Sequence, residues 1–284
     1  EILCSTEEEV YAGLGLPCIP PELREDRGEV QAALEGRLPR LIEVSDIRSE
    51  LHAHTNWSDG KLTIRELAAA ARKRGLAAVV ISDHSASLAI TGGLTAEAVL
   101  QQRQEIRQVQ AELGNSIRLL HGIEVEIRAD GSLDFPDEVL ADFDIVTASL
   151  HTSLRQPRQQ VTERLLKAIR NPHVDVIGHP TGRMFPNREG ADLDMEVILQ
   201  AAREYGVALE INAHPSRLDL DDLYARRFVE RGGLLAINTD AHAESDLDLL
   251  HFGVTIARRA WVQAESVLNT WQLPRLLDWL AARS

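Results

Sequence analysis

The segment Ala77-Ala-Val-Val-Ile-Ser-Asp-His84 sets the pattern that decides the fold of this chain. Its short apolar run is closed by a side chain that can bind a metal ion, which is typical of a buried strand with a functional residue at its carboxyl end. The preceding segment, residues 63–73, has apolar side chains near helical spacing and ends before Gly75. Together the two segments predict a helix followed by a strand of a parallel sheet.

The same alternation of strand and helix recurs from Ser49 onward. We expect strands at residues 50–51, 77–82, 117–123, 144–150, 174–178, 207–211 and 234–238. We expect helices between them at residues 63–73, 95–113, 161–169 and 193–205. The strands are closed in turn by the polar residues His54, His84, Glu124, His151, His179, Asn212 and Asp240.

These closing residues lie between 27 and 40 residues apart, close to the roughly 31 residues that one βα unit of a barrel occupies. Alternating strands and helices favour parallel pairing. Functional residues of βα barrels gather at the carboxyl ends of the strands, where all of these side chains fall. We therefore predict an α/β barrel of about seven βα units. The alternative is an open doubly wound sheet, which would bring only a few strand ends to one crevice.

The first 48 residues have a different character. Residues 16–21, Leu-Pro-Cys-Ile-Pro-Pro, are rich in proline and are expected to be extended. Residues 29–34 could form one short helix. We interpret residues 1–48 as an N-terminal arm or linker and residues 49–284 as one domain.

Composition restricts the partners and the compartment. The formal net charge of −14 has the wrong sign for a protein that grips nucleic acid through a broad basic face. It suits a protein whose carboxylates hold cations. Cys4 and Cys18 are the two cysteines, and so few predict free thiols and a cytoplasmic location. No apolar run approaches the roughly 18 residues of a membrane span, so we expect no membrane partner.

The strand ends carry residues of the types that bind metals. His52 and His54 alternate along an extended strand, so both side chains can reach one ion. Asp59 follows in the next loop, within an Asp-Gly turn. The later strand ends add the remaining candidates, His84, Glu124, His151, His179, Asp240 and His242. Each alone has a structural explanation, such as a packed histidine, but their convergence predicts a metal centre.

The ligand types also restrict the metal. No cysteine is among the candidates, which excludes a structural thiolate zinc site. Imidazole with carboxylate suits Mn²⁺, Zn²⁺ or Fe²⁺. Nine candidates are too many for one ion, so we predict two or three divalent transition-metal ions that share the Glu124 carboxylate. Paired ions about 3.5–4 Å apart hold the attacking and leaving oxygens of a phosphoester displacement, so the pattern predicts a metal-dependent phosphoesterase.

Taken in order, the motifs H-x-H, D-G, S-D-H, G-x-E, S-x-H, G-H-P and D-x-H resemble those of the PHP (polymerase and histidinol phosphatase) superfamily. The resemblance covers residues 49 to about 250. It implies a distorted (βα)7 barrel with a metal site at the C-terminal ends of the strands, in which all nine ligand positions are filled. It implies that one ion is held by His52, His54, Glu124 and Asp240. It further implies that Glu124 and His151 help to hold a second ion and that the remaining positions are completed by Asp59, His84, His179 and His242.

A narrower resemblance is to bacterial family X DNA polymerases. Residues 6–25 resemble the segment that joins the polymerase to the PHP domain in that family, and residues 178–183 and 210–220 also resemble those enzymes. The resemblance implies that the arm leads from an upstream polymerase domain, which this sequence lacks. It also implies that DNA 3′ ends are the substrate of the PHP domain.

Three residues are candidate substrate contacts. Arg183 and Arg217 follow strand-end motifs in loops at the expected mouth, where guanidinium groups can bind phosphate oxygens. Trp57, in the first mouth loop, could stack on a base. The alternatives are that the arginines pair with local carboxylates and that Trp57 packs in the core. His121 alternates to the face opposite Glu124, so we expect it to pack and not to bind metal.

The leading functional hypothesis is a 3′–5′ exonuclease or 3′-phosphatase that processes DNA ends in repair. Glu124, Asp240 and His242 are the expected catalytic residues. The alternatives are a small-molecule phosphatase of the histidinol-phosphatase type and an inactive PHP scaffold that supports a polymerase. The complete ligand set disfavours the scaffold, and assays on DNA and on a phosphate monoester separate the other two.

Overall fold

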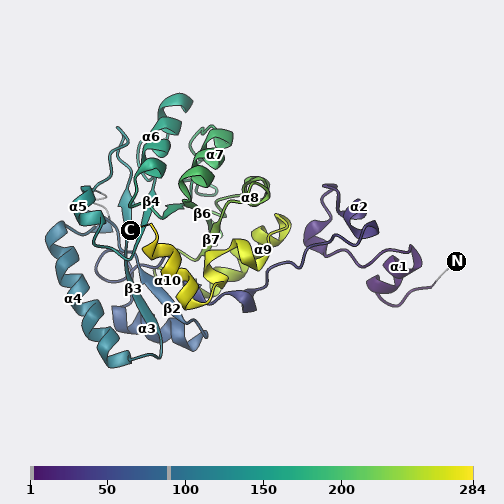
Figure 1. Ribbon diagram of the computed structural model, residues 1–284, viewed down its shortest axis with the longest axis horizontal. Helices are drawn as coiled ribbons and strands as arrows, with labels where there is room; N and C mark the ends of the chain where they lie inside the picture. The colour runs from purple at the N-terminus through teal and green to yellow at the C-terminus, as the bar shows by residue number, and fades with distance from the viewer. Residues whose placement is uncertain (1–2, 88–90, 284) are drawn as a thin grey trace.

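The computed structural model describes residues 3–87 and 91–283. Within these ranges seven parallel strands pair in sequence order and curl into a nearly closed barrel (Figure 1). An isolated bridge between Ala53 and Ala241 brings the first and last strands together. The barrel prediction is confirmed, and the doubly wound alternative is wrong. The strands are β1 Ser49–Glu50, β2 Ala78–Ile81, β3 Arg118–Glu126, β4 Ile145–Ser149, β5 Val176–Gly178, β6 Ala208–Asn212 and β7 Leu235–Asn238.

Helices follow the strands and cover the outside of the barrel (Figure 1). Thr63 and Thr95 cap α3 and α4 through their side chains, as their positions before the apolar periodicity lead one to expect. The four helices predicted between strands are all present, with ends that differ by three residues or fewer. The helices are α1 Glu7–Gly13, α2 Glu29–Leu34, α3 Ile64–Lys73, α4 Ala96–Leu113, α5 Asp137–Leu140, α6 Arg158–Arg170, α7 Met195–Tyr205, α8 Asp222–Glu230, α9 Leu250–Arg259 and α10 Leu273–Ala281.

The buried apolar side chains of the barrel form two clusters. The larger one lies between the strands and the surrounding helices, where residues such as Val79, Ile123 and Ile237 face outward. The smaller one, the interior cluster, draws on successive strands and on α10. Its buried members are Leu51, Val80, Leu120, Ile145, Val176, Ala208, Ala236, Leu268, Trp271, Leu276 and Leu280. The C-terminal segment therefore closes the end of the barrel at which the strands begin.

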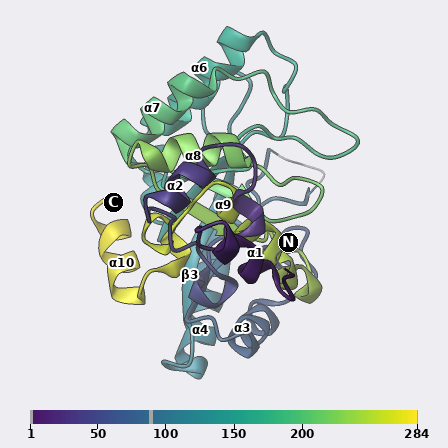
Figure 2. The same cartoon turned by 90° about the vertical axis from the view of Figure 1, so that its right-hand side faces the viewer.

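The N-terminal arm lies beside α8 and α9 (Figure 2). It has a small cluster of its own, formed by Ile19, Leu23, Ala33 and Leu41. Ion pairs fasten it to the barrel: Arg258 Nε lies 2.6 Å from Glu22 Oε1, and Arg259 NH1 lies 2.5 Å from Glu25 Oε1. The arm is thus docked on the barrel, and β1 begins at Ser49.

Two further predictions concern membrane-spanning segments and the cysteines. In residues 3–87 and 91–283 no helix combines the length and apolar character needed to cross a membrane. Cys4 and Cys18 are both free thiols, as predicted.

Candidate metal centre

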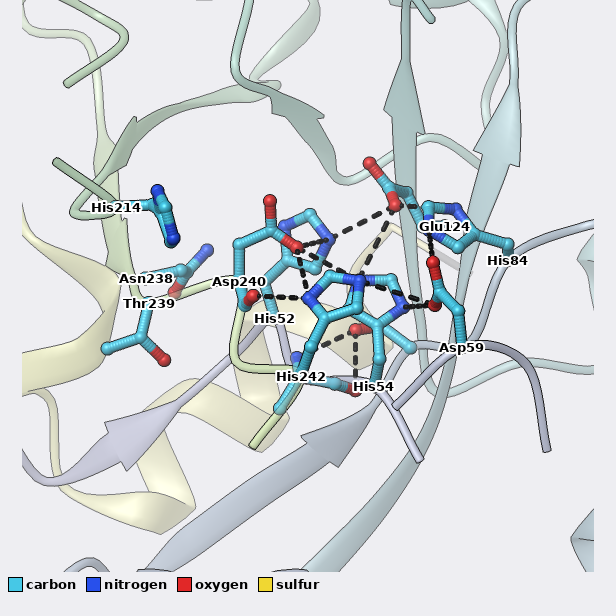
Figure 3. A network of polar contacts seen from close by, with 12 residues as sticks. His52, His54, Asp59, His84, Glu124, His214, Asn238, Thr239, Asp240 and His242 are labelled. Carbon is cyan, nitrogen blue, oxygen red and sulfur yellow. Dashed lines mark hydrogen bonds and ion pairs between the residues drawn. The ribbon is translucent and has the colours of Figure 1, made fainter. Parts of the chain in front are cut away.

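The strand ends bring the nine predicted ligands together in one cluster. Figure 3 shows the part of it formed by His52, His54, Asp59, His84, Glu124, Asp240 and His242. Three overlapping groups have ligand atoms that lie within 4.8 Å of one another. The groups are His54, Asp59, His84 and His242; His52, His54, Glu124 and Asp240; and His84, Glu124 and His151. The ninth residue, His179, directs Nε2 at Glu124 Oε1 over 2.9 Å.

Glu124 lies at the centre of the cluster, on the inward face of β3. Its Oε1 faces His179 and His151, whose Nε2 atoms are 2.9 and 3.3 Å away. Its Oε2 faces His84 Nδ1 at 2.9 Å, His52 Nε2 at 3.4 Å and His54 Nε2 at 3.6 Å. Each carboxylate oxygen therefore lies close to a different set of histidines. A carboxylate needs this arrangement to bridge two ions.

Asp83, the middle residue of the Ser-Asp-His motif, fixes the loop that carries Asp59 through hydrogen bonds. Buried Asp83 accepts hydrogen bonds from the amide and hydroxyl groups of both Thr55 and Ser58, at 2.6–3.2 Å. Gly60 completes the turn, since a Cβ there would approach the His54 backbone to 2.5 Å. Asp83 thus orients the loop and does not itself enter the cluster.

The end of β7 supplies Asp240 and His242. Asp240 Oδ1 lies 3.0 Å from His54 Nε2, and its Oδ2 accepts a hydrogen bond from Asn212 Nδ2 over 3.1 Å. His242 donates from Nδ1 to the carbonyl oxygen of Asp240 over 2.8 Å, which leaves Nε2 facing Asp59 Oδ1 at 3.2 Å. Both side chains accordingly face the cluster, as Figure 3 shows.

The electrostatics suit cation binding. Burial alone would raise the pKa of the Glu124 carboxyl, but His151, His52 and His84 hold it well below its usual range. Asp240 behaves in the same way under the influence of His52 and His54. Burial, His242 and His84 lower the pKa of His54 to about 3. Although burial would lower them, neighbouring carboxylates raise the pKa of His52 well above its usual value and those of His151 and His242 to about 9. The ionised carboxylates and neutral His54 are thus already in the donor forms that divalent metals require, whereas these three rings release a proton when an ion binds.

Unpartnered polar atoms test whether this donor set fits metal ions. Buried polar atoms are normally hydrogen-bonded. Within the described residues, the buried atoms without a hydrogen-bond partner include His52 Nε2, His54 Nδ1, Glu124 Oε2, His151 Nε2 and His179 Nδ1. So many orphaned donor atoms in one cluster, with no cysteine among them, fit a site for Zn²⁺, Mn²⁺ or Fe²⁺ ions.

A cavity of about 270 Å³ lies directly beside the cluster. Its walls include Asp59, His84, His151, Asp240 and His242 on one side and Met184, His214, Ser216 and Arg217 on the other. Arg217 Nε lies 3.4 Å from Asp240 Oδ2, and its buried NH1 has no hydrogen-bond partner among the described residues. Arg217 thus offers a cationic donor group at the edge of the cavity.

The other two candidate substrate contacts lie elsewhere. Arg183 donates from Nε to the carbonyl oxygen of Arg217 over 2.7 Å and from NH2 to that of Leu218. Trp57 packs against the outer core and donates from Nε1 to Glu105 Oε2 over 2.8 Å. Neither residue lines the cavity, so their contact with substrate stays a prediction.

His121 lies outside the cluster, as predicted. Its ring contacts Gln102 and lies 4.7 Å from the Phe143 ring on the outer side of the sheet. Two buried carboxylates that sequence reasoning missed do contact the cluster, namely Glu126 and Glu210. Both could have been found by strand alternation, because Glu126 follows Glu124 by two residues and Glu210 precedes Asn212 by two.

Comparison with known proteins places this geometry in context. A family model described as the PHP domain matches residues 50–214. The DNA polymerase/3′-5′ exonuclease PolX of Bacillus subtilis (strain 168) is 45% identical over 268 residues, which are 94% of this chain and 46% of that protein. This chain therefore spans about half the length of that relative. A probable phosphatase of Thermoanaerobacter sp. (strain X514) is 32% identical over 78% of this chain and 89% of its own length.

A solved structure shares the fold. It is histidinol phosphate phosphatase from Lactococcus lactis in complex with zinc, L-histidinol and phosphate. It is 20% identical to this chain and aligns with a TM-score of 0.56, covering 76% of this chain and 94% of its own.

Proposed function

This chain belongs to the PHP-domain family of metal-dependent phosphoesterases, and from that premise we propose that it processes DNA 3′ ends as a 3′–5′ exonuclease. The observation that carries hydrolysis is the position of Glu124 between two sets of histidines. The support for DNA is the similarity to the Bacillus subtilis relative across 94% of the chain. The proposed setting is the repair function of a family X DNA polymerase.

The proposed metal ligands are the nine residues of the cluster, with Glu124 as the bridge between two or three ions. Bound ions supply neutralisation of phosphate charge and activation of water as a nucleophile. Glu124, Asp240 and His242 are the proposed catalytic residues, because Glu124 reaches both parts of the cluster while Asp240 and His242 line the cavity. Mn²⁺ and Zn²⁺ are the proposed ions, with Fe²⁺ as a third candidate.

Arg217 is the proposed phosphate contact. Arg217 lines the cavity, where a phosphate oxygen would accept a charge-assisted hydrogen bond from its guanidinium. Met184 and Phe185, in the adjoining loop, are 38% and 53% exposed. They offer apolar surface to a base next to the scissile phosphate.

We assign the arm to the connection with an upstream polymerase domain. The support is that the Bacillus subtilis relative is about twice as long as the region it shares with this chain. The polymerase would supply the basic surface that a chain of net charge −14 lacks. Free thiols at Cys4 and Cys18 favour a cytoplasmic setting.

A small-molecule phosphatase is the second candidate. The observation that favours it is the similarity to the Thermoanaerobacter phosphatase over 89% of that protein. A cavity of about 270 Å³ also suits a small phosphate monoester. The inactive scaffold is disfavoured, because all nine proposed ligand positions are filled by residues that can bind a metal.

The test is a side-by-side assay with Mn²⁺. The substrates are a 3′-recessed duplex labelled at the 5′ end of the recessed strand, an oligonucleotide with a 3′-phosphate, and L-histidinol phosphate. We expect stepwise shortening of the labelled strand, loss of activity with EDTA, and weaker activity at high salt because phosphate contacts are screened. Mg²⁺ should be less effective, because it prefers oxygen ligands. Intact DNA with rapid turnover of histidinol phosphate would establish the small-molecule function instead.

A further inference from the structure

Two buried carboxylates outside the nine ligands contact ring nitrogens of the cluster. Glu210 Oε1 lies 2.7 Å from His52 Nδ1, and Glu126 Oε2 lies 2.7 Å from His151 Nδ1. Glu210 is 0% exposed and Glu126 is 3% exposed. Each carboxylate touches the nitrogen that faces away from Glu124.

The surroundings of Glu210 consist of hydrogen-bond donors. It accepts from the amide of His179 at 2.6 Å, from Asn238 Nδ2 at 2.9 Å and from Asn212 Nδ2 at 3.2 Å. A carboxylate that accepts from all its neighbours has no proton to donate to His52. The proton between them therefore belongs to His52 Nδ1, and Nε2 faces Glu124 and Asp240, at 3.4 and 3.6 Å.

Glu126 is placed in the same way at the other side of the cluster. It accepts from Thr152 Oγ1 at 2.8 Å and from the amides of His151 and Thr152, both at 3.2 Å. The buried guanidinium of Arg164 lies 3.4 Å away and adds a further donor. The proton is thus on His151 Nδ1, and Nε2 faces Glu124 Oε1 at 3.3 Å.

We propose that Glu210 and Glu126 are positioning residues that fix His52 and His151 as Nδ1–H tautomers and so present Nε2 to different metal ions. The inference rests on the metal centre proposed above. His52 belongs to the group with His54, Glu124 and Asp240, whereas His151 belongs to the group with His84 and Glu124. Loss of one glutamate should therefore weaken one part of the centre and spare the other.

A purely structural role predicts something different. A buried carboxylate that only ties loops together would lower the stability of the protein when it is replaced, without changing the ring tautomer or the affinity for one particular ion. Glu50 provides the matched control. It is also buried, and it accepts from the His52 amide at 3.0 Å and from Thr239 Oγ1 at 2.7 Å, but it touches no ring nitrogen.

The experiment compares Glu210→Gln, Glu126→Gln and Glu50→Gln with the unaltered chain. Zn²⁺ titration by calorimetry, in competition with a chelator, measures the number of ions and the affinity of each. We expect Glu210→Gln and Glu126→Gln each to lose about 10- to 100-fold in affinity for one ion, because outer hydrogen-bond partners of ligating histidines have effects of this size. Glu50→Gln should keep the affinity of the unaltered chain.

Long-range ¹H–¹⁵N correlation spectra of the Zn²⁺-loaded proteins supply the second readout. The unaltered chain should show Nδ1–H on both His52 and His151. The His52 pattern should change only in Glu210→Gln, and the His151 pattern only in Glu126→Gln. If either glutamine variant fails to fold, the charge-retaining Glu210→Asp or Glu126→Asp replaces it. Because the shorter carboxylate no longer reaches the ring nitrogen in the same way, this variant should also lose affinity for one ion, and an affinity equal to that of the unaltered chain would overturn the proposal.

The outcomes separate the two levels of inference. Unchanged Zn²⁺ affinity and unchanged tautomers in the glutamine variants would overturn the positioning role and leave the metal centre intact. An equal loss in Glu50→Gln would also overturn it, because it would show that a buried glutamate near His52 has this effect without contacting a ring nitrogen. An unaltered chain that binds no Zn²⁺ at the cluster would instead overturn the proposed function.

Discussion

Leu120 and Glu124 lie four residues apart on the same inward face of β3, yet they belong to opposite ends of the barrel. Leu120 packs in the interior cluster, which α10 closes. Glu124 lies within 3.6 Å of the nitrogens of five histidines. Because alternate residues of a strand face the same side, β3 passes from the apolar core to the polar centre within two steps along its inward face.

The difference separates stability from chemistry. Burial of apolar area at the closed end favours folding, at roughly 25 cal/mol per Å². The mouth instead buries polar atoms such as Glu124 Oε2 and His151 Nε2, which have no hydrogen-bond partner in the part of the chain that the structure describes, and this disfavours folding. Apolar burial at the closed end offsets this cost. In βα barrels the end at which the strands begin usually stabilises the fold, and the end at which they finish carries the functional residues. The two ends should thus respond differently to substitution.

The largest effect is expected at the mouth, for Glu124→Ala. Both parts of the cluster lose a shared ligand, so kcat/KM should fall by at least about 10³-fold, or about 4 kcal/mol of transition-state stabilisation. His151→Ala is the matched comparison and should lose less, since it removes one terminal ligand. Metal content and phosphoesterase kinetics measure both variants. A milder loss for Glu124→Ala, with unchanged metal content, would contradict the bridging role.

The next effect is expected at the closed end, for Leu120→Ala. Removing a fully buried leucine side chain should lower the free energy of unfolding by about 2–5 kcal/mol, while kcat of the folded protein stays within about twofold. Urea denaturation and kinetics below the unfolding transition measure the two quantities. Leu100→Ala is the control, because Leu100 is 53% exposed. A kcat loss as large as that of a ligand variant would break the separation of the two ends.

A pH effect is expected at the closed end as well. Asp175, which precedes β5, accepts from the Val146 amide and pairs with Arg283 after α10. Burial raises the pKa of Asp175 from 3.8 to about 6. The folded state therefore binds the proton more tightly, so this contribution to stability is fully present below about pH 4 and is lost as the pH rises through about 6.

Asp175→Asn should remove that dependence. Between pH 4 and 7 the unfolding free energy of the variant should rise relative to the unaltered chain by up to about 3 kcal/mol, at about 1.4 kcal/mol per pH unit. Denaturation of both proteins at several pH values measures the difference. Parallel curves would show that the Asp175 carboxyl titrates alike in the folded and unfolded states.

A smaller effect at the mouth is expected for Arg217→Gln. Loss of one charge-assisted hydrogen bond to phosphate should lower kcat/KM by about 10- to 100-fold, with metal content unchanged. Arg183→Gln is the comparison, because the Arg183 guanidinium already donates to the carbonyl oxygens of Arg217 and Leu218. An equal loss for Arg183→Gln at unchanged stability would make Arg183 a phosphate contact after all.

The barrel and the cluster could be predicted because both follow from short-range patterns. Each inner strand is an apolar run, and the polar residue that closes it stands out from that run. Parallel pairing then brings all the closing residues to one end. Most residues of the site can therefore be located from the seven strand ends, which lie at similar intervals along the sequence.

Contacts between distant segments could not be predicted in this way. The arm is docked through the pair of Glu22 and Arg258, which are 236 residues apart in the chain. Arg183 and Arg217 both follow strand-end motifs in the sequence. In the folded chain, however, the Arg183 guanidinium donates to the carbonyl oxygen of Arg217, whereas Nη1 of Arg217 has no hydrogen-bond partner among the described residues. Helix α1 was missed although Thr6 caps it, because its isolated apolar residues give no helical period.

The most direct test of the central claim is elemental analysis of purified, active protein. Eight candidate ligands in three overlapping groups, with His179 beside Glu124, should hold two or three transition-metal ions per chain. Removing them with EDTA should abolish phosphoester hydrolysis, and adding back Mn²⁺ should restore it. A fully active protein that contains one ion or none would contradict the account.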